Sequence, residues 1–230
     1  MPQARRYFLA EANVESPYSL FASSRYRPGV AAPLIVALHG SGASPDEIMY
    51  ARGLLPLADE RGYIVVAPMG LNPFGGFGSR GPGRAAGRPD DPENAGALSE
   101  LDVMHVIDLV QREFTIDDRR VFLFGHSMGG AGALYLAGAH PGRWAGIALF
   151  APGGRGDGPP VAALKNVRTI IFQGKDDTQV SVVNTRRMVA LMRRSIDAFE
   201  YHELVGDHFS IIDWSPQNIR RTFEFFEGVK

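Results

Sequence analysis

A serine flanked by glycines stands near the middle of the chain, in the segment FGHSMGG at residues 124–130. An apolar run leads into it and a run of small residues follows. The order strand, Gly-x-Ser-x-Gly, helix is typical of a nucleophile elbow, a tight turn that lifts a serine hydroxyl above the edge of a sheet. Side chains at Gly125 or Gly129 would collide with the neighbouring strand or helix. We therefore predict Ser127 as the nucleophile of an acyl-transfer reaction.

A serine of this kind needs a general base, and three histidines follow it in the sequence. His140 precedes a proline at the end of the helix expected after the serine, where a histidine more often caps carbonyl groups. His202 lies inside an expected strand. His208 comes just after that strand, at the sheet edge where the serine is expected. We therefore predict His208 as the base.

The base needs an orienting acid, and in this arrangement the chain order is Ser, then Asp or Glu, then His. The segment after the strand that precedes His208 offers Asp176 and Asp177. Adjacent residues point in different directions, so only one of the two is expected to reach the imidazole. Aspartate is also a common helix cap, which is the alternative for either residue. We favour Asp177 over Asp176, and Asp157 in a glycine-rich segment is a third candidate.

A second glycine-containing loop, HGSG at residues 39–42, follows a strongly apolar run. Gly40 allows a close approach of the backbone. The backbone N–H of Ser41 is the expected partner of the N–H of Met128 in stabilising a developing oxyanion. His39 precedes the serine in chain order, so we expect it to hold the loop by hydrogen bonds rather than to act as a base.

The elements that position these residues are expected to be short strands alternating with amphipathic helices. From residue 34 onward the strand candidates are continuously apolar, as strands covered on both faces require, so a parallel sheet is expected. The alternation predicts a mostly parallel, doubly wound α/β sheet flanked by helices. Strands are expected at 18–26, 34–40, 63–70, 120–127, 144–152, 168–177 and 198–205, and helices at 44–62, 99–114, 181–196 and 211–229.

Three local features carry more specific expectations. Pro56 is expected to break or bend the first helix. Ser99 and Asp102 have the spacing of a capping box at the start of the second helix. Residues 71–98 are rich in glycine and proline and leave the ligand-binding edge of the sheet, so a functional or disordered loop is expected there. The phenylalanines at 74 and 77 would either form an aromatic wall or anchor a surface loop, and both alternatives stay open.

Composition narrows the class of protein. The chain has 230 residues with a formal net charge of −1, and its basic residues are scattered among as many acids, which argues against a nucleic-acid partner. The absence of cysteine excludes disulfides, zinc thiolate sites and a cysteine nucleophile. No stretch has the length of a membrane span or of a signal-peptide core. We expect one domain over residues 1–230, cytoplasmic or secreted after removal of a leader, and the oligomeric state stays open.

The motifs together resemble the α/β-hydrolase superfamily, and within it the compact serine esterases of the polyhydroxybutyrate-depolymerase-like and feruloyl-esterase-like branch. The resemblance implies Ser127, Asp177 and His208 as a catalytic triad. It also implies an oxyanion hole from the N–H groups of Ser41 and Met128, with no cofactor and no metal. The segments that carry the resemblance are 33–42, 58–70, 101–137, 174–182 and 206–209.

The activity implied by this resemblance is that of a serine carboxylesterase, with a small-molecule ester as its partner. About fifteen residues, 153–167, separate two expected strands, which leaves no room for a separate lid domain. A lidless site suits short-chain or aryl esters better than long-chain lipids. A peptidase of the prolyl-oligopeptidase type, an acyltransferase and a catalytically silent binding module remain alternatives.

Overall fold

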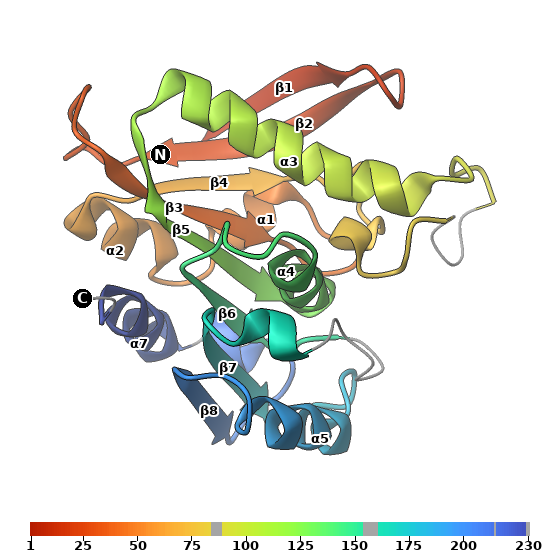
Figure 1. Cartoon of the computed structure of the whole chain (residues 1–230), viewed down its shortest axis with the longest axis vertical. Coiled ribbons are helices and arrows are strands. Elements are labelled where there is room, and N and C mark those ends of the chain that lie inside the picture. Colours follow the sequence, from red (N-terminus) through yellow and green to blue (C-terminus); the bar gives the residue numbers. More distant parts are fainter. Residues whose placement is uncertain (84–88, 154–160, 214, 229–230) are drawn as a thin grey trace.

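The apolar runs of the sequence form the centre of an eight-stranded sheet in the computed structural model (Figure 1). The structure describes residues 1–83, 89–153, 161–213 and 215–228. The strand order is β1-β2-β4-β3-β5-β6-β7-β8, in which β1 and β2 are antiparallel to their neighbours and the other six strands run parallel. The strands are β1 (Gln3–Leu9), β2 (Val14–Ala22), β3 (Ala32–Leu38), β4 (Ile64–Pro68), β5 (Ile116–His126), β6 (Gly146–Phe150), β7 (Arg168–Gly174) and β8 (Phe199–Leu204).

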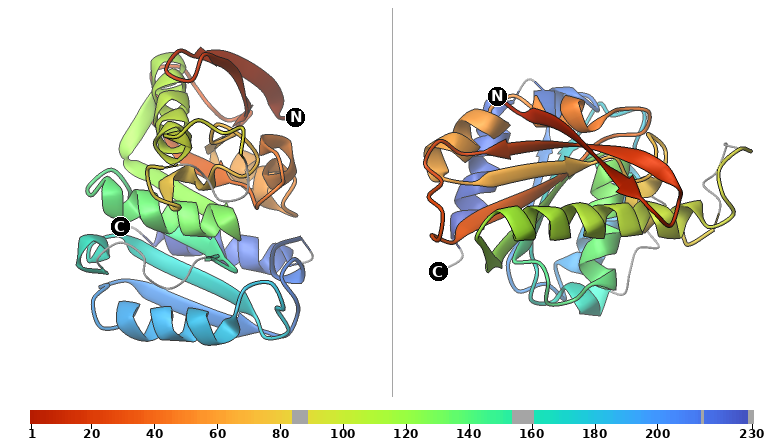
Figure 2. Two further views of the ribbon diagram at one scale, coloured as in Figure 1. Left: turned by 90° about the vertical axis from the view of Figure 1, so that its right-hand side faces the viewer. Right: turned by 90° about the horizontal axis from the view of Figure 1, so that it is seen from above.

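Helices cover both faces of this sheet, and the two further views in Figure 2 show the layers on either side. One face carries α3 (Ala95–Glu113), α4 (Met128–Ala139) and α5 (Val182–Met192). The opposite face carries α1 (Pro45–Met49), α2 (Leu54–Arg61), α6 (Ser210–Asp213) and α7 (Pro216–Glu227). Short 3₁₀ turns lie at Gly76–Gly78 and Val161–Leu164. None of the described helices is both long and apolar enough to cross a membrane.

Successive residues of the central strands enter two different cores. In β3, Leu34 and Val36 pack on the α3–α4 side, whereas Ile35 packs on the α1–α2 side. All three side chains are fully buried. This is why these strands are continuously apolar rather than alternating. The expected α/β-hydrolase fold, a mostly parallel doubly wound sheet, is confirmed, and the described residues indicate no separate lid domain.

Strand β1 has no counterpart among the predicted strands. Its sequence, QARRYFL, contains no continuous apolar run, because most of its residues are exposed or half-buried at the edge of the sheet. It pairs with β2 through a turn at residues 10–13, in which Asn13 has a positive φ of 53°. Pairing with β1 also extends β2 to Val14, four residues before its predicted start.

The first predicted helix is broken, but not by its proline. Helix α1 ends at Met49 and α2 begins at Leu54, after a glycine in the left-handed conformation at position 53. Pro56 is the third residue of α2. A proline in the first turn of a helix removes no intrahelical hydrogen bond, so Pro56 is tolerated there.

The predicted capping box in α3 is wrong. The helix begins before both residues, which lie buried inside it. The Ser99 hydroxyl donates to the carbonyl of Gly70 and accepts from the backbone N–H of Phe77, each at 2.8 Å. The Asp102 carboxylate accepts from the N–H of Gly70 at 2.7 Å and from the Tyr7 hydroxyl at 2.8 Å. Both side chains therefore hold the loop after β4 instead of capping the helix.

Candidate active site

Ser127 lies at a strained turn between β5 and α4. Its φ and ψ are 55° and −116°, a region that residues with a side chain rarely occupy. The turn is fixed on both sides of the serine. The Ser127 N–H donates to the carbonyl of Phe150 at 2.9 Å, and the Ser127 carbonyl accepts from the N–H of Gly153 at 2.8 Å. The surrounding structure therefore imposes the conformation that the Gly-x-Ser-x-Gly pattern predicts.

The flanking glycines are required by close backbone contacts. A β-carbon at Gly129 would lie 2.0 Å from the carbonyl oxygen of Leu38 in β3. A β-carbon at Gly125 would lie 2.2 Å from the carbonyl oxygen of Gly129. Backbone cannot yield as a flexible side chain can, so no larger residue fits at either position.

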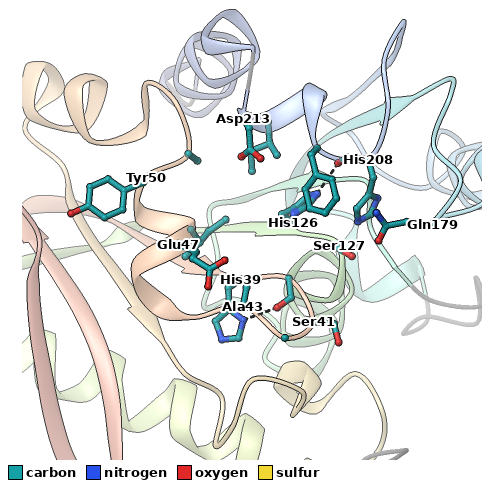
Figure 3. Close-up of a pocket in the computed structure, with 16 residues that line it drawn as sticks. His39, Ser41, Ala43, Glu47, Tyr50, His126, Ser127, Gln179, His208 and Asp213 are labelled. Carbon is teal, nitrogen blue, oxygen red and sulfur yellow. Dashed lines mark hydrogen bonds between the residues drawn. The ribbon is translucent and has the colours of Figure 1, made fainter.

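Ser127 and His208 both line one cavity of about 580 Å³ (Figure 3). In Figure 3, Glu47 from α1 and Asp213 from α6 also face this cavity, on the side away from Gln179. The cavity therefore has two carboxylates in a lining that also contains apolar side chains such as Ile48 and Ile212. Among its described lining residues there is no lysine or arginine.

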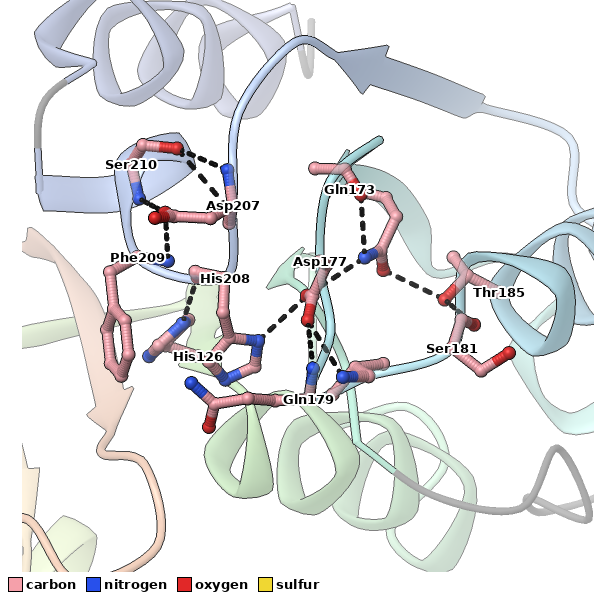
Figure 4. Close-up of polar contacts among 12 residues, drawn as sticks. His126, Gln173, Asp177, Gln179, Ser181, Thr185, Asp207, His208, Phe209 and Ser210 are labelled. Carbon is pink, nitrogen blue, oxygen red and sulfur yellow. Dashed lines mark hydrogen bonds and ion pairs between the residues drawn. The ribbon is translucent and has the colours of Figure 1, made fainter.

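His208 forms a buried hydrogen bond with Asp177, shown in Figure 4. The Nδ1 atom of His208 lies 2.8 Å from Oδ2 of Asp177, and the side chains are 4% and 0% exposed. Oδ2 also accepts from the side-chain amide of Gln173 at 3.0 Å. Oδ1 accepts from the backbone N–H groups of Gln179 and Val180, each at 2.8 Å.

These hydrogen bonds decide the charge of Asp177. Burial alone would raise the pKa of its carboxyl group. The N–H of Val180, the His208 ring and the N–H of Gln179 together outweigh burial and hold the pKa of Asp177 below its usual value. The carboxylate is therefore ionised at neutral pH and stabilises a proton on Nδ1 of His208.

The structure thus brings His208 to Asp177 and not to the neighbouring aspartate. The Asp176 carboxylate instead accepts from the N–H of Gly206 at 3.1 Å. Asp157 lies outside the described residues. The catalytic roles of Ser127, Asp177 and His208 are taken up below as a proposal.

The loop with the predicted oxyanion donor lies beside the elbow. A β-carbon at Gly40 would be 3.7 Å from Cβ of Ser127, and Ser41 lines the same cavity. The N–H of Gly42 donates to the carbonyl of Pro73 at 2.8 Å, which ties this loop to the one after β4. Met128 is the first residue of α4, where a backbone N–H has no intrahelical acceptor.

His39 is fully buried and joins two loops. Its Nδ1 and Nε2 atoms lie 2.8 Å and 3.0 Å from the carbonyl oxygens of Gly40 and Met69. Burial is the largest effect on His39 and lowers its pKa, and the neutral ring has one N–H to donate to these two carbonyls. This geometry agrees with the expectation that His39 holds the loop.

The remaining two downstream histidines lie away from Asp177. His140 directly follows α4, and its Nε2 atom lies 2.7 Å from the carboxylate of Glu100, so its ring bonds to this side chain where a bond to helix carbonyls was expected. His202 lies in β8 and bonds to Glu200 at 2.8 Å. Neither residue lines the cavity that contains Ser127.

The two phenylalanines of the glycine-rich loop do not line that cavity either. Phe77 is fully buried, with its ring centroid 5.2 Å from that of His39. Phe74 packs against the loop glycine at position 42. Of the two alternatives left open by the sequence, Phe77 fits the buried anchor.

His126 is a site residue that the sequence analysis did not select. Its Nε2 atom lies 2.9 Å from the backbone carbonyl oxygen of His208. The signal that could have found it is its place in the Gly-His-Ser triplet, directly before the nucleophile. Among the described residues no three His, Asp or Glu side chains are grouped as metal ligands would be.

The sequence profile of the serine aminopeptidase S33 family matches residues 76–215 of this chain. The chain belongs to that family. The matched segment contains the elbow serine, the buried aspartate and the histidine of the cavity. Together with the sheet order, the match confirms the predicted membership of the α/β-hydrolase superfamily.

Several ester hydrolases are similar to this chain. S-formylglutathione hydrolase of Rattus norvegicus is 32% identical over 129 residues, which are 52% of this chain and 46% of the relative. The match therefore spans less than half of the relative's length. A thermostable esterase structure superposes with a TM-score of 0.78 at 24% identity, covering 99% of this chain and 62% of the other. The ferulic acid esterase AmCE1/Fae1A of Anaeromyces mucronatus superposes with a TM-score of 0.73 at 19% identity, covering 100% and 90%. These superpositions show that the chain shares the fold of these two esterases.

Proposed function

We propose that this protein is a serine carboxylesterase that hydrolyses short-chain or aryl carboxylic esters through an acyl-enzyme on Ser127. One observation carries the proposal: an elbow serine and a histidine with a buried carboxylate partner open on one cavity. The family membership and the named ester hydrolases among the relatives support the reaction class.

In the proposed reaction, His208 takes the hydroxyl proton of Ser127 through Nε2 as the serine oxygen attacks the ester carbonyl carbon. The carbonyl π electrons move to oxygen, and the backbone N–H groups of Ser41 and Met128 stabilise the oxyanion. Collapse of this intermediate breaks the bond to the leaving alcohol, which receives the proton from His208. A water molecule, deprotonated by His208, then attacks the acyl-enzyme and releases the acid.

Asp177 acts in this scheme by holding the imidazole. Its Oδ2 accepts the Nδ1–H of His208 at 2.8 Å, which leaves the lone pair on Nε2 free for the serine proton. The ionised carboxylate also stabilises the imidazolium that forms in each half-reaction. Because the carboxylate accepts from two backbone N–H groups as well, its own position is fixed before substrate binds.

The family description favours a second candidate, cleavage of an amide bond next to a free amino group. The same nucleophile and base would serve, but an amine is a poorer leaving group than an alcohol. Matched substrates separate the two reactions: an aminoacyl p-nitroanilide reports the peptidase, and p-nitrophenyl butyrate reports the esterase. We expect the ester to be turned over with the higher kcat/KM.

The deciding test is a p-nitrophenyl ester series from acetate to palmitate on wild type and on Ser127→Ala, with fluorophosphonate labelling of both. We expect turnover of acetate or butyrate to exceed that of palmitate. The Ser127→Ala change should lower kcat by at least ~10⁴-fold and abolish labelling. Ser181→Ala is the matched control, because Ser181 caps α5 and does not line the cavity. Turnover or labelling that survives in Ser127→Ala would refute the nucleophile.

A further inference from the structure

The histidine before the nucleophile, His126, contacts the base directly. Its side chain is almost fully buried, at 7% exposure, although it reaches the cavity that contains Ser127. The His126 ring centroid lies 4.7 Å from that of His208 and 5.6 Å from that of Phe209. Its Nε2 atom is 2.9 Å from the backbone carbonyl oxygen of His208 (Figure 4).

This contact fixes the protonation of the ring. A carbonyl oxygen is only an acceptor, so Nε2 of His126 must carry a hydrogen and donate it. Burial, the largest effect, lowers the pKa of His126 to about 4. At neutral pH the ring is therefore uncharged, with its hydrogen on Nε2 and a lone pair on Nδ1.

The other side of the ring faces the predicted oxyanion loop. A β-carbon at Gly40 would lie 3.6 Å from Nδ1 of His126. The ring thus contacts the base loop on one side and lies beside the predicted oxyanion loop on the other, while its own backbone ends β5 at the elbow.

His208 needs a second attachment because of where it lies. It follows β8 in a surface segment, between Val205, which is 84% exposed, and Phe209, which is 48% exposed. Asp207 binds the N–H groups of Phe209 and Ser210, and Gly206 exchanges hydrogen bonds with Asp176 just after β7. None of these bonds is made by the backbone carbonyl of His208 itself.

The hydrogen bond to Asp177 alone does not determine where Nε2 of His208 points. A ring held only at Nδ1 can still swing as its backbone moves. A second hydrogen bond, to the backbone carbonyl of His208, fixes the backbone as well as Nδ1 and so sets the direction in which Nε2 points. That direction matters because Nε2 must meet the serine hydroxyl within hydrogen-bond distance.

We propose that His126 is a positioning residue, which orients His208 for proton transfer by donating a hydrogen bond to the His208 backbone carbonyl. The inference rests on the proposed function, since it gives His126 a role in the reaction of Ser127. A misplacement of about 1 Å at a reacting group costs ~10²-fold in rate, so the expected effect lies in kcat and not in substrate binding.

The test compares His126→Leu with His126→Gln. The amide nitrogen of glutamine is as many bonds from Cβ as Nε2 of histidine, so it can donate to the same carbonyl, whereas leucine leaves the carbonyl unpaired. We expect His126→Leu to lower kcat by ~10–100-fold with KM within ~3-fold, and His126→Gln to recover most of the loss. Both are measured with p-nitrophenyl butyrate per fluorophosphonate-titrated site, so that a misfolded fraction does not count.

A pH profile provides the readout that a purely structural role would not change. With a loosened His208, the imidazolium loses alignment with Asp177, so the acid limb of kcat/KM should move to lower pH in His126→Leu and stay in place in His126→Gln. His202→Leu is the matched control, because His202 is a half-buried histidine that does not line the cavity.

Either of two results would overturn the proposal. In one, the kcat of His126→Leu per titrated site stays within twofold of wild type and the acid limb of its pH profile is unchanged. In the other, the kcat of His126→Gln falls as far as that of His126→Leu. If His126→Leu does not fold, His126→Asn replaces it, because its amide nitrogen is one bond closer to Cβ and falls short of the carbonyl. A Ser127→Ala variant that still turns over ester would refute the proposed function separately, without bearing on the contact between His126 and His208.

Discussion

Replacing Asp177 by asparagine tests the chemistry of the site without removing atoms from it. In wild type, Oδ1 of Asp177 accepts from two backbone N–H groups, and Oδ2 accepts from Gln173 and His208. An asparagine oxygen must take the position that faces the two N–H groups, since an NH₂ there would meet two donors. The asparagine NH₂ is then directed at the amide nitrogen of Gln173 and at Nδ1 of His208.

This forced orientation has a defined consequence for the base. His208 can satisfy the new donor only by presenting a lone pair at Nδ1, which places its own proton on Nε2. The Nε2 atom then cannot accept the proton of Ser127. Loss of the correct tautomer in such a triad costs ~10³–10⁴-fold in kcat, which is ~4–5.5 kcal/mol at about 1.36 kcal/mol per decade.

The assay is kcat for p-nitrophenyl butyrate at neutral pH, with urea unfolding of each variant as the folding control. Asp176→Asn is the matched substitution, because the carboxylate of Asp176 accepts from the N–H of Gly206 and an asparagine oxygen can do the same. We expect Asp176→Asn to stay within ~3-fold of wild type. The reasoning fails if Asp177→Asn keeps more than ~10% of wild-type kcat, or if Asp176→Asn loses as much.

Three further outcomes follow from the geometry. Gly129→Ala places a β-carbon 2.0 Å from the carbonyl oxygen of Leu38, so urea unfolding should show a free energy of unfolding that is lower by ~3 kcal/mol or more. The control Gly142→Ala, whose β-carbon meets nothing within 4 Å, should lower it by ~1 kcal/mol. Glu47→Gln removes one carboxylate from the cavity lining and with it the repulsion of a negatively charged acyl group. The ratio of kcat/KM for a succinyl aryl ester to that for a butyryl aryl ester should rise ~2-fold at low salt, the value for charges ~8 Å apart in water, and this rise should vanish in high salt. The pKa of His126 is lowered to about 4 in the folded state, so the unfolded chain binds a proton at this ring more readily and the free energy of unfolding falls as the pH drops from ~6.5 towards 4. Urea unfolding of His126→Gln should show a fall in the free energy of unfolding that is smaller by on the order of 3 kcal/mol.

The parts of the site that the sequence could predict are those set by local backbone rules. The elbow can be recognised from five consecutive residues, because the close contacts at Gly125 and Gly129 exclude every larger residue. Chain order and the ends of apolar runs then pointed to His208, and loop spacing favoured Asp177 over its neighbour. The single domain and the catalytic roles stay predictions, which the variants above test.

What could not be predicted depends on contacts between distant segments. The spacing of Ser99 and Asp102 fits a capping box, but the same two side chains are also the right length to bond the loop after β4, and helix α3 starts early enough to place them there. Strand β1 is largely polar because it forms by pairing with β2 at the edge of the sheet, where most of its side chains are not buried in a core. The bond between His126 and His208 joins residues 82 positions apart, which no local pattern records.

The loop at residues 39–42, with the predicted oxyanion donor, is positioned by a chain of buried contacts that starts in α3. Ser99 accepts from the N–H of Phe77, and the Phe77 ring lies against His39. His39 in turn bonds to the carbonyl of Gly40, which lies beside Ser127. Each link is fully buried or made by backbone, so a shift at one link cannot be absorbed by solvent. The polar pair inside α3 therefore acts on the same loop that His126 contacts from the other side, and the proposed catalytic groups are held between two sets of buried polar bonds.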